Sequence, residues 1–124
     1  MDVAARTRRN KRRGADWEAE LRDALRGVGM DVERLRLTGK NDEGDLVVRL
    51  NTGRFLVIEA KNARLEPAQF VAEADAEREN FARHRGLDRA SVDSVVIVRR
   101  RGASWRRAYV LTTVERFFGL EAER

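Results

Sequence analysis

The chain has 124 residues, of which 42% are hydrophobic and 38% charged, and this suffices for one folded domain with its own core. No apolar run approaches the roughly 20 residues that a membrane-spanning helix needs, and the N-terminus lacks the apolar segment of a secretion signal. Cysteine is absent, which excludes disulfides and thiolate metal sites. We expect no membrane association and a cytoplasmic protein, in the host cytoplasm if a phage encodes it.

Positive charge is concentrated at the N-terminus. Residues 1–13 hold six basic side chains and one acidic one, which accounts for the whole formal net charge of +5. We interpret residues 1–13 as a flexible basic arm and residues 14–124 as the folded domain. Such an arm suits a polyanion such as DNA, because each neutralised phosphate releases counterions; the alternative is a solvated tail without a partner. The DNA-binding residues expected in the arm are Arg8, Arg9, Lys11, Arg12 and Arg13.

The spacing of apolar residues predicts an α/β fold in the order αβββαββα. Glycines end the first helix, Gly53 lies in a hairpin turn, and Pro67 opens the long helix. The expected elements are a helix at 14–27, strands at 32–37, 45–50 and 55–61, a helix at 67–84, strands at 94–98 and 107–112, and a short C-terminal helix. This order predicts a mixed central sheet flanked by helices.

The hairpin brings two acidic residues together. If Leu50 faces Arg54 across the turn, Asp45 lies opposite Glu59. Opposed side chains have Cβ atoms about 5 Å apart, and two like charges at that distance destabilise a sheet unless a cation separates them. A divalent metal is the simplest such cation, and Mg²⁺ prefers carboxylate oxygens. The sequence therefore predicts a Mg²⁺ site at these two residues, with Mn²⁺ able to substitute.

Lys61 is expected on the same face of the strand as Glu59, because strand side chains alternate with a period of two. Its ammonium group would lie beside the metal, where it can orient a water molecule or stabilise charge that develops on a phosphate. The chain contains only three lysines among its 26 basic residues, so a lysine here indicates a need for a compact point charge. The alternative is an ordinary charge at a strand end.

A third carboxylate is expected from the first helix. The apolar stripe of that helix contains Trp17 and Leu21, and at about 100° per residue Glu18 lies nearer to its centre than Glu20 does. We therefore expect Glu18 to lean over the sheet, and Glu20 and Asp16 to face solvent. The alternative for Glu18 is an ordinary charge at the boundary of the buried stripe.

Three segments together resemble a known family. Glu18 follows Gly14 by four residues, Asp45 lies in a Gly-Asp-Leu-Val-Val segment, and Glu59 and Lys61 lie in Ile-Glu-Ala-Lys. This pattern resembles the PD-(D/E)XK nuclease superfamily, and more closely the archaeal-type Holliday-junction resolvases and their phage relatives, over about residues 11–84. The resemblance implies that Asp45 and Glu59 bind Mg²⁺, that Lys61 assists the attacking water, and that Glu18 reaches the metal through water. It also implies a homodimer with two active sites.

The chain departs from the family pattern in places. Glu43 and Gly44 stand where a proline often precedes the first acid, a difference that the superfamily tolerates. In the loop before Asp45, Thr38 is the candidate for the hydroxyl that resolvases use, and Lys40 could contact phosphate. Gln69 begins the next long helix, where many relatives carry a glutamine that supports the site; the alternative is an exposed helical glutamine.

The expected function is that of a metal-dependent, structure-selective DNA endonuclease, which resolves four-way junctions by phosphodiester hydrolysis. One alternative is another nuclease of the superfamily, of restriction, repair or flap type. The other is a non-catalytic DNA-binding module, which would not need acidic residues near phosphate. The sequence has no glycine-rich phosphate-binding motif, so no nucleotide cofactor is expected.

Overall fold

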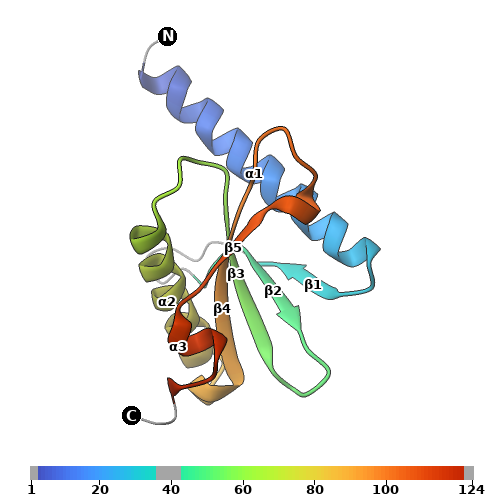
Figure 1. Cartoon of the computed structure of the whole chain (residues 1–124), viewed down its shortest axis with the longest axis vertical. Coiled ribbons are helices and arrows are strands. Elements are labelled where there is room, and N and C mark those ends of the chain that lie inside the picture. The colour runs from blue at the N-terminus through green and yellow to red at the C-terminus, as the bar shows by residue number, and fades with distance from the viewer. Residues whose placement is uncertain (1–2, 36–42, 122–124) are drawn as a thin grey trace.

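The computed structural model describes residues 3–35 and 43–121. It has the predicted element order, with two additional 3-10 helices, η1 and η2 (Figure 1). The elements are α1 (Val3–Gly27), β1 (Asp31–Arg34), β2 (Leu46–Arg49), β3 (Phe55–Lys61), α2 (Pro67–His84), η1 (Arg89–Ser91), β4 (Val92–Val98), η2 (Trp105–Arg107), β5 (Tyr109–Leu111) and α3 (Val114–Phe117). The predicted fold class, a mixed α/β sheet flanked by helices, is confirmed. No described helix is long and apolar enough to cross a membrane.

The sheet has five strands in the order β1-β2-β3-β4-β5. Only β3 and β4 pair in parallel, because α2 carries the chain back between them. In the β2–β3 hairpin, Leu46 pairs with Ile58 and Arg49 pairs with Phe55, which confirms the predicted register. Asp45 directly precedes β2, so it continues this register toward Glu59.

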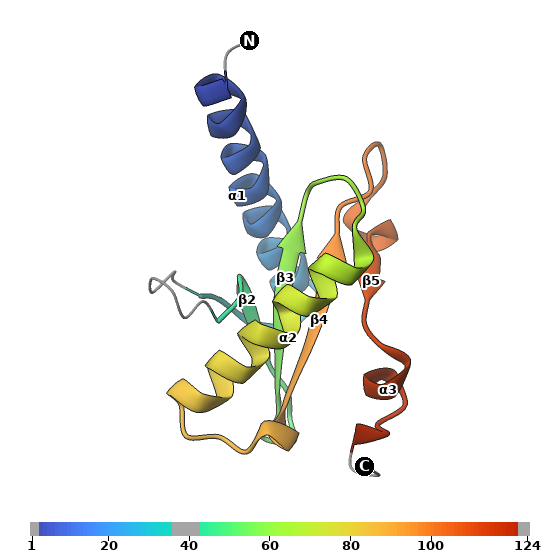
Figure 2. The same cartoon turned by 90° about the vertical axis from the view of Figure 1, so that its left-hand side faces the viewer.

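The two long helices cover opposite faces of the sheet. On one face, Trp17 and Leu21 of α1 are buried against strand residues such as Leu46 and Ile58. On the other face, α2 contributes two aromatic residues, Phe70 and Phe81, to two smaller clusters. Figure 2 shows α2 lying across the strands, with α1 on their far side. Both faces of β4 are therefore packed, as its apolar sequence predicts.

The predicted start of the first helix is wrong. We expected the helix to begin near residue 14, but α1 begins at Val3 and includes the basic segment. Residues 3–13 contain no proline or glycine and several strong helix formers, so the helix anchored by Trp17 propagates toward the N-terminus. Figures 1 and 2 show this half of α1 projecting beyond the sheet.

Smaller differences also separate the observed elements from the predicted ones. The last strand is shorter than expected, because Ser104 caps the 3-10 helix η2 and residues up to Arg107 belong to that turn. β4 begins at Val92, two residues before the predicted start. On α2, Glu77 and Arg78 are buried, which the apolar pattern alone does not indicate.

Candidate active site

A glycine positions the first acidic residue of the site. Gly44 has a φ angle of +104°, and a Cβ atom there would lie 2.6 Å from Cγ1 of Val57. Only glycine accepts this backbone conformation and this close approach without strain. The chain can therefore pass tightly over β3, and the Asp45 carboxylate accepts a 2.8 Å hydrogen bond from the backbone N–H of Ala60.

Asp45 and Glu59 come together as the hairpin register predicts. Their side chains interact with each other; Glu59 is buried and Asp45 is partly buried. Burial, reinforced by the charges of Glu59 and Glu18, raises the pKa of Asp45 to about 9. Burial raises the pKa of Glu59 to about 9, and the interaction with the neighbouring Glu77 carboxyl group adds to the increase. Such a pair of perturbed carboxyl groups is characteristic of functional sites, since a fold gains no stability from placing them together.

Glu77 of α2 is a member of this cluster that the sequence reasoning missed. Glu77 is 7% exposed, and its carboxyl group interacts with that of Glu59. Its Oε2 lies 3.4 Å from the point where a Cβ atom of Gly44 would stand. The four carboxyl groups thus form a chain in the order Glu18, Asp45, Glu59, Glu77.

Lys61 lies beside this chain of carboxyl groups. Its Nζ is 3.7 Å from Oε1 of Glu59 and 2.5 Å from Oε2 of Glu73 on α2, and it lies over the ring of Phe70. Burial acts to lower the Lys61 pKa, but the hydrogen bond to Glu73 and the charge of Glu59 outweigh it and raise the pKa. Lys61 is therefore a cation at neutral pH, which favours charge stabilisation over proton abstraction.

Glu18 reaches the site from α1, as the helical spacing predicts. Its side chain interacts with Asp45, and its Oε2 accepts a 2.8 Å hydrogen bond from Arg34 of β1. The two acids expected to face solvent, Asp16 and Glu20, are exposed. Glu18 thus lies near the hairpin acids but also forms an ion pair with Arg34. Its role as a metal ligand stays a prediction.

The hairpin acids can supply two carboxylate ligands to Mg²⁺, but not a complete set of protein ligands. Within residues 3–35 and 43–121, no three His, Cys, Asp or Glu side chains form a group that could hold a metal ion. Mg²⁺ is usually held by one or two carboxylates, with water and substrate phosphate as its other ligands, so Asp45 and Glu59 meet that requirement. Apart from neighbouring carboxyl groups, the buried Oε2 of Glu59 has no hydrogen-bond partner in the described part of the chain, which leaves it available to a cation.

The remaining predicted residues fall into two groups. Gln69 donates a 3.1 Å hydrogen bond to Glu73, so it contacts the partner of Lys61 and not the hairpin acids themselves. Thr38 and Lys40 lie outside the described residues. The five basic residues expected to bind DNA all lie on α1, where Arg8, Arg9, Lys11 and Arg12 are exposed and Arg13 is partly buried.

Comparisons with known proteins give little beyond this geometry. No protein-family model matches the chain, and no curated protein matches it either. Among solved structures, the chain is similar to Hjc, a Holliday junction resolvase from the archaeal hyperthermophile Archaeoglobus fulgidus, with 22% identity and a TM-score of 0.49. The similarity covers 80% of this chain and 71% of that one. A likeness of this size carries no functional argument, so the function rests on the residues of this chain.

Proposed function

We propose that this chain is a Mg²⁺-dependent DNA endonuclease that cleaves branched DNA, four-way junctions above all. The observation that carries the proposal is the meeting of Asp45 and Glu59 at one end of the hairpin, with Lys61 beside them. A non-catalytic DNA-binding module would have no use for buried carboxyl groups next to a phosphate site. The preference for junctions rests on the sequence resemblance to resolvases.

Each residue of the site would have a distinct task. Asp45 and Glu59 would hold Mg²⁺, which when bound neutralises charge on the phosphodiester and acidifies the attacking water. The Lys61 ammonium, fixed by Glu73 at 2.5 Å, would orient that water or stabilise charge on the phosphate in the transition state. Gln69 would act indirectly, since its hydrogen bond to Glu73 helps to hold the partner of Lys61 in place.

A homodimer is part of the proposal, because paired cuts across a junction need two sites at a fixed separation. Exposed apolar side chains of β5 and of the segment around α3 support it, since exposed apolar surface can mark a protein contact. The most exposed are Val110, Val114, Phe117 and Phe118. We expect a dimer mass by light scattering for the native chain and a monomer mass for Phe117→Asp/Phe118→Asp.

The direct test is to incubate the protein with Mg²⁺ and a matched panel of four-way, flap, nicked and linear duplexes. We expect paired cuts in the four-way junction, no cleavage in EDTA, and none by Asp45→Asn. Cleavage of another substrate in preference would indicate a restriction, repair or flap nuclease. Binding without any cleavage, with Mg²⁺ or Mn²⁺ present, would contradict the nuclease proposal and leave a DNA-binding module.

A further inference from the structure

A basic groove adjoins Lys61, between α1 and the loops that follow β3 and β4. One part is a hollow of about 400 Å³ lined by Arg13, Gly14, Ala60, Lys61, Asn62, Ala63, Arg64 and Arg101. It continues into a hollow of about 350 Å³, which Arg99 and Gly102 also line. Figures 1 and 2 both place the two loops at the end of the sheet beside the projecting half of α1.

The walls of this groove are tied together. The side-chain amide of Asn62 donates a 3.5 Å hydrogen bond to the backbone carbonyl of Arg13, which joins the loop after β3 to α1. Arg99 at the end of β4 lies 3.8 Å from Glu20 of α1. The turn that carries Arg101 is closed by Gly102, which has a φ angle of +75°. The groove is therefore part of the folded body and does not depend on residues outside the described part of the chain.

Three arginines of the groove have no neutralising partner among the residues that the structure describes. No acidic residue lines either hollow. Arg13, Arg64 and Arg101 make no ion pair with any residue that the structure describes. Three unneutralised guanidinium groups around one concave surface are suited to several successive anionic groups, such as the phosphates of a nucleic acid strand.

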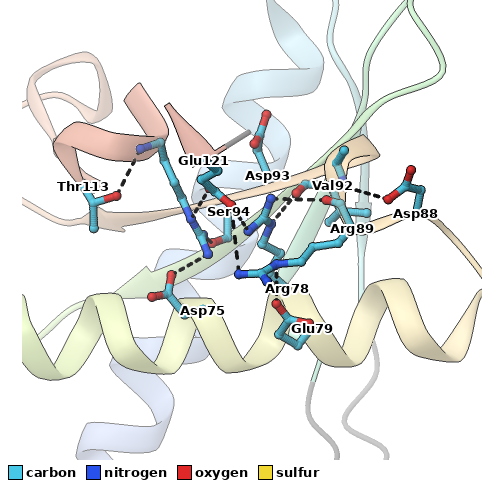
Figure 3. Close-up of polar contacts among 12 residues, drawn as sticks. Asp75, Arg78, Glu79, Asp88, Arg89, Val92, Asp93, Ser94, Thr113 and Glu121 are labelled. Carbon is cyan, nitrogen blue, oxygen red and sulfur yellow. Dashed lines mark hydrogen bonds and ion pairs between the residues drawn. The ribbon is translucent and has the colours of Figure 1, made fainter. Parts of the chain in front are cut away.

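A second arginine-rich hollow, at the other end of β4, provides the contrast. It has a volume of about 460 Å³, and three acidic residues line it together with four arginines. Arg78 pairs with Glu121 (Figure 3). Arg116 also pairs with Glu121, and with Asp75. Arg89 pairs with Glu79 (Figure 3). Internal ion pairs occupy those arginines, so that hollow fixes the C-terminal segment to α2 and has no excess charge for an external anion.

We propose that the groove lined by Arg13, Arg64 and Arg101 binds the phosphate backbone of one nucleic acid strand and leads it to Lys61. This inference rests on the proposed function, and it adds the loops after β3 and β4 to the DNA-binding surface. Of the DNA-binding residues expected from the sequence, Arg13 lines the groove from α1, and Arg64 and Arg101 line it from the two loops. Backbone contacts of this kind fix the position of the strand without reading its sequence.

The test measures binding in EDTA, so that no cleavage intervenes. Arg64→Gln/Arg101→Gln is compared with Arg83→Gln/Arg107→Gln, which removes the same charge from exposed positions outside the groove. Affinity for a labelled duplex and a single strand of equal length is measured between 50 and 200 mM salt. For the groove variant, we expect the slope of log K against log salt to flatten by about 1.8 on duplex, or about 1.4 on single strand, and the control to change much less.

Comparing the two nucleic acids shows whether the groove prefers a strand of a duplex or a single strand. The preferred form is the one for which the groove variant loses more affinity. Equal slopes for the groove variant and the control, with both thermally as stable as the native chain, would overturn the groove assignment. This result is separable from a failure of the nuclease proposal. A native protein that binds through the groove but cuts nothing would contradict only the nuclease, and cleavage with unchanged binding by the groove variant would contradict only the groove.

Discussion

The carboxyl groups of Asp45 and Glu59 lie close enough to perturb each other at the end of the β2–β3 hairpin. The backbone N–H of Ala60 holds one of them, and Glu77 contacts the other. The pKa of each is raised to about 9, mainly by burial. Protonation relieves the repulsion between two such groups when no metal is present, and a divalent cation can take the place of the protons. The behaviour of the protein toward metal, pH and DNA should therefore depend on this pair.

Neutral replacement of either acid should separate cleavage from binding. We expect Asp45→Asn and Glu59→Gln to abolish cleavage and to bind DNA as tightly as the native chain or more tightly, because repulsion between carboxylate and phosphate is removed. Asp16→Asn, at an exposed acid on α1, is the matched control and should cut normally. Full activity in both hairpin variants would show that the site is elsewhere.

Lys61→Arg tests whether shape matters in addition to charge. The ammonium of Lys61 fits between Glu59 and Glu73 and lies over the ring of Phe70, and a planar guanidinium has a different size and geometry. We expect the Arg variant to lose activity by about 10²-fold or more in kcat, close to the loss in Lys61→Ala. Single-turnover cleavage at saturating DNA is the appropriate measurement. Near-native kcat in the Arg variant would reduce Lys61 to a simple balancing charge.

The raised pKa values predict an unusual dependence of stability on pH. Between about pH 5 and pH 9, the folded protein retains protons on Asp45 and Glu59 that the unfolded chain has released, since the ordinary values are 3.8 and 4.5. The free energy of unfolding of the metal-free protein should therefore fall as pH rises through this window.

Removing one of the two charges should flatten that dependence. We expect the stability of Asp45→Asn relative to the native chain to increase by about 4 kcal/mol between pH 5 and pH 8, at about 1.36 kcal/mol for each pH unit, as measured by urea denaturation in EDTA. Added Mg²⁺ should stabilise the native chain more at pH 8 than at pH 5, because binding must displace protons. A difference between variant and native chain that is independent of pH would contradict the raised pKa values.

Sequence rules sufficed where the geometry is local. The period of two along β3 and the hairpin turn placed Asp45, Glu59 and Lys61 together, and the helical spacing selected Glu18. These residues lie on elements that are adjacent in sequence or have a clear apolar stripe. The pH behaviour and the metal fit could not be predicted to the same degree, because both depend on how deeply the carboxyl groups are buried.

Two features were not predicted: the position of Glu77 in the site, which depends on tertiary packing, and the helical conformation of the basic segment, which depends on local composition. Glu77 joins the site only because α2 docks on the sheet through Phe70 and Phe81. Its spacing from these residues follows the helical period, so a charge at a core-facing position was an available signal. The charge of residues 3–13 favours a flexible arm, but their composition favours a helix, and the helix is what forms.

Glu77 should tune the affinity for metal without being a ligand in the proposal. Because its contact raises the pKa of Glu59, Glu77→Gln should let Glu59 ionise at lower pH and should strengthen Mg²⁺ binding near pH 7. Isothermal titration with Mg²⁺ across pH 6 to 9 measures this, together with the thermal shift on metal addition. Glu79→Gln, on the exposed side of α2, is the control. Weaker binding at every pH would instead make Glu77 a ligand.

The basic half of α1 should set the strength of DNA binding and not its selectivity. Arg8, Arg9 and Arg12 are exposed on a helix that projects beyond the sheet, and they make no ion pair with the residues that the structure describes. Replacing all three by glutamine removes charge but keeps a helix-forming residue, so the fold anchored at Trp17 should persist.

Binding of this triple variant should weaken on junction and linear duplex alike. The slope of log K against log salt should flatten by about 0.9 for each phosphate that the variant no longer neutralises. Preference for the junction should survive, because it would come from two active sites held apart in a dimer. Salt titrations on both substrates, with circular dichroism to verify the helix, provide the measurement. A slope equal to that of the native chain would mean that this half of α1 does not touch DNA, and a weakening confined to the junction would mean that it takes part in recognising the branch.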